Sequence, residues 1–427
     1  MLKKIVNTFL VKILTALINL AVAVLISQWM GASGKGTQGL FLATLAMTTT
    51  LTGLFGIIPL CYLVPQKPTL NYYIIANSWA FIASGFTYIF LKVTGLISYD
   101  QILLLSFTTL FSALATINLS IYLIREKIPT YNWALFSQTF VLILLIVLFY
   151  TFYQEFSIHH YIYSLFGSYV FLFLLSIPGS VRYFKEMDKI TIKNFGADTK
   201  TMFRYGFYNQ TALLFQMVSF RGSFYILEKY SSIQDVGIFS NAVSIVESIW
   251  IINRSLSLVF YSRIINSKSK EYSKEVFKKF SIISFWSLGL VMFVLVLIPG
   301  SFYVFLFGED FVSLKSVIVL LIPGTVFFGQ SLITTHYFSG TGKHHINLVS
   351  NLVGMIFILS ISYLLIPNYS IVGAAAASNI GYICLFLVQF YFIRQIYKVS
   401  LIDQVYDKIW FGELRKQLIK SINDFKN

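Results

Sequence analysis

The chain has 427 residues, of which 57% are hydrophobic and only 11% are charged, and its mean hydropathy is +0.74. Soluble domains carry about 25% charged residues, so this composition excludes an ordinary soluble protein and indicates a polytopic membrane protein. The formal net charge of +15 would by itself suggest a nucleic-acid partner, but that partner requires a basic face on a soluble domain, and none is expected here.

Twelve apolar runs approach or exceed the roughly 20 residues that a helix needs to cross the hydrocarbon core. They lie at about residues 9–30, 39–64, 71–95, 101–124, 131–152, 160–181, 205–227, 236–262, 280–306, 312–339, 346–366 and 370–393. The first run exceeds the 7–15-residue apolar core of a cleaved signal peptide, so we expect it to be a retained span. Cys61 and Cys384 lie inside apolar runs and indicate neither a disulfide framework nor a metal site.

Lysine and arginine residues predict the orientation, because connections rich in them stay in the cytoplasm. One set of alternate connections carries 25 of the 32 basic residues, the other carries four, and three lie inside spans. Both termini are therefore expected in the cytoplasm. The basic charge is thus a topology signal, and it could also contact anionic lipid headgroups.

The connections also suggest how the chain is divided. We expect an N-terminal lobe of six spans at 1–183, a cytoplasmic linker at 184–203, a C-terminal lobe of six spans at 204–394 and a basic amphipathic tail at 395–427. The tail pattern is typical of a helix on a membrane surface, although binding of a partner protein would also fit it. The predicted fold class is all-α, a polytopic membrane protein with about 12 transmembrane helices in two six-helix lobes around a central cavity.

Three motifs carry a family resemblance. They are Met30–Gly36 after the first span, Asp235–Ala242 at the eighth and Ile366–Ser378 at the last. Together they resemble the lipid-linked oligosaccharide flippases of bacterial polysaccharide pathways, within the multidrug, oligosaccharidyl-lipid and polysaccharide exporter superfamily. Ser370 stands where such proteins often have glycine. Because small residues let helices approach closely in lipid, we expect Gly373–Ser378 to be a packing surface.

The resemblance implies a flippase that is not an enzyme. It would move polyprenyl-diphosphate-linked oligosaccharide repeat units across the bacterial cytoplasmic membrane by alternating access, for a surface polysaccharide such as lipopolysaccharide O-antigen. The implied partners are this substrate, membrane lipids, and a polysaccharide polymerase or other pathway proteins. No catalytic residue, cofactor, metal or nucleic-acid partner is expected.

Charged and polar residues inside spans are the candidate site, because a charge near the middle of a bilayer costs at least about 2.5 kcal/mol and marks a functional position. The resemblance implies a cationic cavity for the diphosphate and sugar, and the candidates are Lys12, Asn19, Arg221 and Arg254. Arginine suits phosphate because its planar fork donates two charge-assisted hydrogen bonds. Lys12 and Arg221 could instead extend to the nearer membrane surface.

Two further residues could carry protons or balance charge. Glu247 shares a predicted helix face with Ser240, Ser244 and Arg254, and could be an ion-pair partner, a proton carrier or both. His336 could relay protons near neutral pH, or it could be a hydrogen-bonded packing residue.

Two other functions remain as alternatives. A cation-coupled multidrug exporter of the same superfamily would need acids for its cationic substrates or ions, and the first six spans hold none away from their ends. A polysaccharide polymerase or ligase would be expected to carry a sizeable outer catalytic loop, but the outer connections are short. No GxxxxGK[ST] nucleotide-binding loop occurs.

Overall fold

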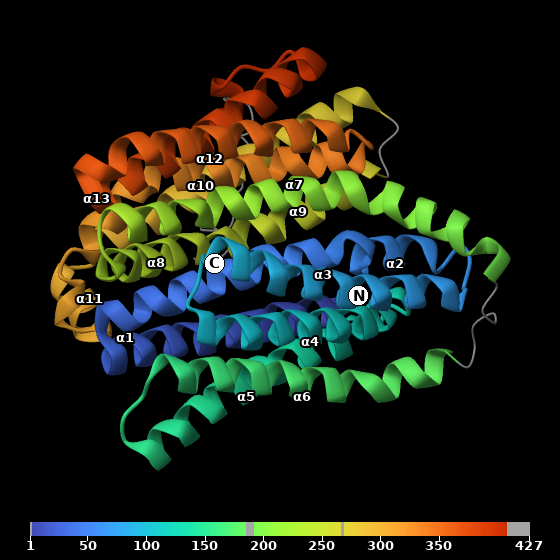
Figure 1. Ribbon diagram of the computed structural model, residues 1–427. Helices are drawn as coiled ribbons and strands as arrows, with labels where there is room; N and C mark the ends of the chain where they lie inside the picture. The colour runs from blue at the N-terminus through green and yellow to red at the C-terminus, as the bar shows by residue number, and fades with distance from the viewer. Residues whose placement is uncertain (1, 185–191, 266–268, 408–427) are drawn as a thin grey trace, which may run out of the picture. The chain divides into compact units, whose positions relative to one another are not determined.

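The computed structural model describes residues 2–184, 192–265 and 269–407, and every regular element in those ranges is a helix (Figure 1). The elements are α1 (Leu2–Thr52), η1 (Gly53–Phe55), α2 (Ile57–Leu63), α3 (Leu70–Thr94), α4 (Tyr99–Ile124), α5 (Ile128–Tyr153), α6 (Ile158–Phe184), η2 (Ile192–Asn194), α7 (Phe195–Tyr230), α8 (Ile233–Ser248), α9 (Trp250–Ile265), α10 (Lys270–Leu297), α11 (Gly300–Phe307), η3 (Glu309–Phe311), α12 (Leu314–Gly340), α13 (His344–Tyr397) and η4 (Ile402–Gln404).

Helix lengths account for the twelve predicted spans. Nine helical stretches among the described residues are long and apolar enough to cross a membrane. Two of them, Leu10–Leu63 and His344–Tyr397, have 54 residues each, or about 80 Å of helix, against a hydrocarbon core of about 30 Å. Gly31 in the first stretch and Ser370 in the second are non-helical, and the chain turns there. The first stretch has a further break at Gly56, between η1 and α2. Each long stretch therefore counts as two spans, and the more polar α7 completes the twelve.

Packing within α13 shows that this long element is a hairpin. A methyl group at Gly381 would collide with Ile358 and lie 3.0 Å from the carbonyl oxygen of Gly354. Residues 23 to 27 positions apart can touch in this way only if the two halves of the element lie side by side. The segment Gly373–Ser378 is buried except for the half-buried Ala376, which confirms its predicted role as a packing surface.

The first compact unit comprises the described part of Met1–Asn241 together with Ser301–Leu314. In it, α4 packs against α3 and α6, and α6 packs against α5, as the blue-to-green helices of Figure 1 show. A buried apolar cluster that includes Ile26, Phe41, Leu105 and Ile146 joins α1, α4 and α5. This unit includes α7, so it extends beyond residue 183, the predicted end of the N-terminal lobe. The division into two six-span lobes stays a prediction.

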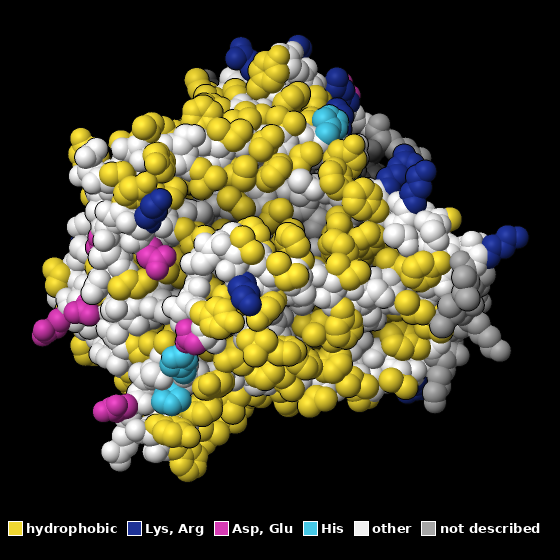
Figure 2. All heavy atoms as spheres, in the orientation of Figure 1, with side chains coloured by type: hydrophobic (Ala, Val, Ile, Leu, Met, Phe, Trp, Pro, Cys, Tyr) yellow, Lys and Arg dark blue, Asp and Glu magenta, His cyan; other side chains and the backbone are white. Residues whose placement is uncertain are grey.

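The second compact unit comprises Ala242–Gly300 and the described part of Lys315–Asn427. Its core contains Phe260, Phe277, Phe338 and Phe390, contributed by α9, α10, α12 and α13. Many large apolar side chains of the described chain are exposed, for example Phe86 (56%) and Leu290 (65%), and Figure 2 shows hydrophobic side chains over much of the visible surface. Such surfaces are expected where helices face lipid.

Several boundaries differ from the prediction. The helix α7 begins at Phe195, inside the predicted linker, because a polar first turn remains helical before the apolar part starts. The basic segment before the ninth span is continuous with that span in α10. The eighth span is divided into α8 and α9. Most of the predicted amphipathic tail, residues 408–427, lies outside the described residues.

Candidate functional site

In the first unit, the predicted cationic face of α1 is accessible. Lys12 and Asn19 are exposed, whereas Val11, Val22 and Ile26 are buried. Periodic burial of this kind leaves one helix face free of protein packing. The first span therefore presents a cation and an amide that a ligand could reach.

Arg221 of α7 is half-buried. Its Nη1 donates a hydrogen bond to the carbonyl oxygen of Phe220 at 3.5 Å, and its guanidinium carbon lies 5.5 Å from the centre of the Phe224 ring. An aromatic ring stabilises a nearby cation through its quadrupole. Arg221 is therefore held in part by contacts within its own helix. These contacts favour a cation that stays within the span over a side chain that extends to the membrane surface.

In the second unit, Arg254 and His336 lie on neighbouring helices, α9 and α12, which are joined by the bond from Asn253 to Gly329. Arg254 is exposed. His336 Nδ1 lies 2.9 Å from the carbonyl oxygen of Leu332, and because a carbonyl only accepts, Nδ1 is the donor. This bond leaves Nε2 of His336 as the ring nitrogen with acceptor capacity.

Glu247 and Arg254 do not share one continuous helix. The amide of Ile249 bonds to Val246 and that of Ile252 bonds to Ile249, at 3.4 and 3.1 Å, so the backbone tightens between α8 and α9. Beside this break, the fully buried Trp250 donates from Nε1 to the carbonyl oxygen of Thr325 at 3.0 Å. The stripe that the sequence predicts through both residues is therefore interrupted, while Glu247 itself is half-buried.

Two polar side chains, one on α7 and one on α8, are used for packing. Gln210 Nε2 donates to the carbonyl oxygen of Thr50 at 2.6 Å. Ser240 is 4% exposed, and a methyl group added at Gly39 would lie 3.1 Å from it. Neither side chain is positioned primarily for a ligand.

The first two sequence motifs meet in the first unit. A methyl group at Gly237 would collide with the carbonyl oxygen of Ala32 and lie 3.0 Å from the amide nitrogen of Gly36, and one at Gly36 would collide with the carbonyl oxygen of Ile233. The glycines therefore allow the backbones of α1 and α8 to touch, as small residues do between membrane helices. Their role here is structural.

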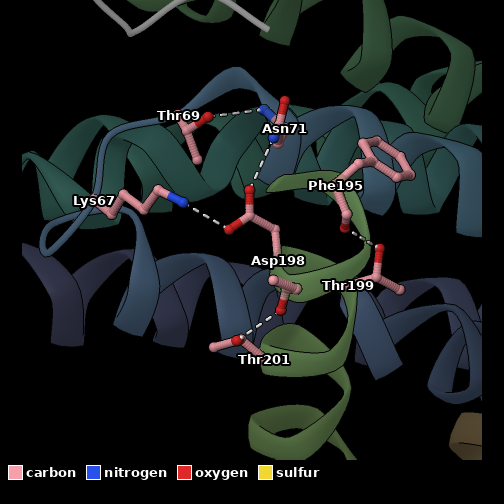
Figure 3. A network of polar contacts seen from close by, with 8 residues as sticks. Lys67, Thr69, Asn71, Phe195, Asp198, Thr199 and Thr201 are labelled. Atoms are coloured by element: carbon pink, nitrogen blue, oxygen red, sulfur yellow. Dashed lines mark hydrogen bonds and ion pairs between the residues drawn. The ribbon is translucent and has the colours of Figure 1, made fainter. Parts of the chain in front are cut away.

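Sequence reasoning missed two charged features of the first unit. Lys35 is only 5% exposed and donates to Gln38 Oε1 at 2.6 Å, although the sequence places it in an outer connection. Asp198 is 4% exposed and binds Lys67 and Asn71 (Figure 3). A polar residue at the start of a long helix gives no signal of a partner more than 120 positions away.

The described residues contain no group of three or more His, Cys, Asp or Glu side chains that could hold a metal. They do contain a neutral polar cluster in the second unit. Asn253 Nδ2 donates to Ser284 Oγ at 2.5 Å and to the carbonyl oxygen of Gly329 at 2.8 Å, and Gln330 Nε2 donates to the carbonyl oxygen of Ser281 at 3.2 Å. This cluster ties α9, α10 and α12 together.

No protein-family model matches the chain. A curated relative, the capsular polysaccharide biosynthesis protein CapF of Staphylococcus aureus, is 27% identical over 177 residues, which cover 40% of this chain and 44% of that protein. The chain thus matches less than half of this relative's length.

Solved structures are similar over nearly the whole chain. A lipid II flippase MurJ in an inward closed conformation has a TM-score of 0.74 at 15% identity, covering 100% of this chain and 94% of that one. A multidrug resistance MATE family transporter has a TM-score of 0.70 at 16% identity, covering 92% and 99%. A transporter from Pyrococcus furiosus has a TM-score of 0.61 at 14% identity, covering 93% and 97%. The chain is therefore an all-α, multi-pass membrane protein with the fold of the multidrug, oligosaccharidyl-lipid and polysaccharide exporter superfamily, as its motifs indicate.

Proposed function

We propose that this protein is a flippase that moves a polyprenyl-diphosphate-linked oligosaccharide across the bacterial cytoplasmic membrane, with both termini in the cytoplasm. The exposed cations Lys12 and Arg254, on helices of a transporter fold, carry the proposal. A diphosphate needs cationic partners on its path, while its polyprenyl tail stays in lipid. The partial similarity to a capsular polysaccharide biosynthesis protein supports a polysaccharide pathway.

A cation-coupled multidrug exporter is the second candidate, because a multidrug transporter structure also covers most of the chain. The distribution of acids favours the flippase. In α1 to α6 and their connections up to Phe184, the acids are Asp100 in the first turn of α4, Glu126 after α4 and Glu155 after α5. None lies within a span where a cationic drug would be held.

Deleting the protein tests the proposed activity. The lipid-linked repeat unit should still be made but should stay on the cytoplasmic leaflet, which accessibility to an impermeant glycosidase added outside would measure. If the unit reached the outer leaflet while chain extension stopped, a polymerase would be the better assignment.

Substituting Arg254 tests its role in substrate binding. Arg254→Lys should keep part of the transport because the charge remains, whereas Arg254→Gln should lose nearly all of it. Arg263→Gln, which removes an exposed cation near the end of the same helix, is the matched control and should transport almost normally. Surface polymer, normalised to protein in the membrane, is the measurement.

A double substitution separates binding from charge balance. If Arg254 only neutralised Glu247, changing both to Gln should restore what either change destroys, because no unpaired charge would remain. We expect no rescue, since α8 and α9 are separated at Ile249. Full recovery in the double variant would move Arg254 from substrate binding to structure.

A further inference from the structure

A buried carboxylate joins three helices at one end of the first unit. Lys67 Nζ donates to Asp198 Oδ1 and Asn71 Nδ2 donates to Asp198 Oδ2, each at 2.8 Å (Figure 3). Lys67 follows α2, Asn71 lies in the first turn of α3 and Asp198 in the first turn of α7. Each carboxylate oxygen therefore receives its own donor from the α2–α3 region.

The two donors are fixed by a tight turn. The amide of Lys67 bonds to the carbonyl oxygen of Leu63 at 2.9 Å, and the amide of Thr69 bonds to that of Lys67 at 2.9 Å. Thr69 Oγ1 then accepts from the amide of Asn71 at 3.3 Å and caps α3. Because these bonds are local, the backbone at Lys67 and Asn71 keeps its spacing without help from α7.

The exposure of the pair is unequal. The Asp198 side chain is 6% exposed, whereas that of Lys67 is 47% exposed. Because the Asp198 carboxylate is buried, its bonds help to hold the first turn of α7, and a buried charge that loses its partner is costly. The Lys67 ammonium is half-exposed, so some of its N–H groups can also be reached from solvent. Asn71 is 0% exposed, so an anion with two adjacent oxygens could bind both donors only where the carboxylate of Asp198 now lies.

The neighbouring surface is also basic. Lys193, Lys200 and Arg204 are exposed on η2 and α7, and clustered cations raise the local concentration of anions. This end of the unit is the one that the charge distribution predicts to be cytoplasmic, where a lipid diphosphate would be made. An incoming headgroup would therefore meet a positive surface before it met Lys67.

We propose that Lys67 and Asn71 form an anion site which the protein's own Asp198 carboxylate occupies, and that the diphosphate of an arriving substrate displaces this carboxylate. The inference rests on the proposed function for the identity of the anion. It assigns to Lys67 a binding role at the entrance, separate from the residues within the spans.

Displacement of Asp198 would weaken the packing of α7 against the preceding spans. This helix is held to the preceding spans by Gln210 on Thr50, and Gly206 lies so close to Leu54 that a methyl group would collide with its carbonyl oxygen. Releasing the first turn of α7 removes the bonds of Asp198 with Lys67 and Asn71, which hold α7 in place next to the close contact of Gly206 with Leu54. Substrate arrival would thereby loosen α7 from the α1–α2 region.

Binding of inorganic diphosphate to the purified full-length protein in lipid nanodiscs tests the site by calorimetry. Asp198→Ala should bind it about tenfold more tightly than the unmodified protein, a gain of about 1.4 kcal/mol. Adding Lys67→Gln should abolish this gain. Equal affinity of Asp198→Ala and the unmodified protein, or a gain that survives Lys67→Gln, would overturn the proposal.

A matched control is available in the second unit. Lys278 and Asp403 form an ion pair of 2.9 Å with exposures of 22% and 33%. Partial burial raises the pKa of Asp403, but hydrogen bonds from the Ser400 backbone and from Lys278 outweigh it, and the net pKa is lowered. The second oxygen of Asp403 accepts from Ser400, which is exposed and three residues away on the same turn, so among the described residues Lys278 has no buried amide donor from another helix beside it. Asp403→Ala should therefore leave the diphosphate affinity unchanged, and an equal gain of affinity there would attribute the effect of Asp198→Ala to net charge and overturn the proposal.

Two safeguards keep the test decisive. If Asp198→Ala fails to fold, Asp198→Asn removes the charge and keeps the shape, and it should still gain affinity severalfold. The binding measurement needs no transport. If Asp198→Ala gains diphosphate affinity but the deletion strain still flips the lipid-linked unit, the anion site stands and the proposed substrate is wrong. If Asp198→Ala gains no affinity but the deletion strain traps the unit, the proposed substrate stands and the anion site is wrong.

Discussion

The two long helical hairpins turn through the same kind of backbone conformation but use different residues. Gly31 in α1 has φ 64° and ψ −170°, and Ser370 in α13 has φ 45° and ψ −125°. Side chains are disfavoured at such positive φ values, so glycine is the natural residue for both. One hairpin therefore has the expected glycine, and the other tolerates a serine.

The surroundings of the turns explain this difference. Asp310 Oδ2 accepts from the amide of Ala32 at 2.9 Å, and Gln28 Nε2 donates to the carbonyl oxygens of Phe305 and Leu306 at 3.1 and 2.9 Å. The turn of α1 is thus joined to a segment about 278 positions away. The turn of α13 is packed locally, with Gly373 against the backbone of Leu365, and Tyr369 beside it is 60% exposed.

This contrast suggests that the turn of α1 depends on a contact with a distant segment. A residue at the α1 turn must fit beside a carboxylate from a distant segment, whereas Gly373, close to the α13 turn, packs against Leu365 of the same hairpin. We infer that changes at the α1 turn affect transport as well as stability, because docking of distant segments is what a transport cycle would alter.

Gly31→Ala should have the largest effect. The backbone conformation costs a side chain about 1–3 kcal/mol, and the new methyl group would lie 2.7 Å from Asp310 Oδ2. We expect a clear drop in the thermal unfolding midpoint of the purified protein and loss of most surface polymer. Gly85→Ala is the control, since a methyl group there meets nothing within 4 Å. Normal stability and transport in Gly31→Ala would remove the distinction between the turns.

Asp310→Ala should have a smaller effect. It removes the acceptor that caps the helix after Gly31, which is worth about 1 kcal/mol, and leaves the glycine in place. Transport should fall severalfold, while Asp310→Asn should keep much of it, because an amide oxygen can still accept from Ala32. Glu309→Ala removes the adjacent exposed acid and should behave normally. If Asp310→Ala and Glu309→Ala lost transport to the same extent, the negative surface charge would explain the loss, and not the cap at Ala32.

The positions of the spans could be predicted from the sequence better than the contacts between them. Apolar length identified the spans and placed the end of the first one near Gly31. The cap from Asp310 and the pairing of Asp198 escaped prediction, because each partner is distant along the chain and charged residues at helix ends are common. The break at Ile249 escaped it too, since no glycine or proline occurs between Glu247 and Arg254. Among the candidate site residues, Arg254 and His336 lie on helices that pack against each other, as the bond from Asn253 to Gly329 shows.

Ser370→Gly should have the smallest effect, and of the opposite sign. Relief of the left-handed backbone is worth about 1–2 kcal/mol, but glycine loses more chain entropy on folding, about 0.5–1 kcal/mol. These two backbone effects leave a net stabilisation of about 0.5 kcal/mol, from which any contact of the serine side chain is subtracted. The unfolding midpoint should rise slightly and transport should not change. Ser362 lies inside a helix of the same hairpin and is fully buried. Ser362→Gly should lower the midpoint instead, because glycine there raises the entropy of the unfolded chain and relieves no backbone strain. If Ser370→Gly destabilised the protein, the serine side chain would be holding the turn, and the α13 turn would depend on side-chain contacts as the α1 turn does.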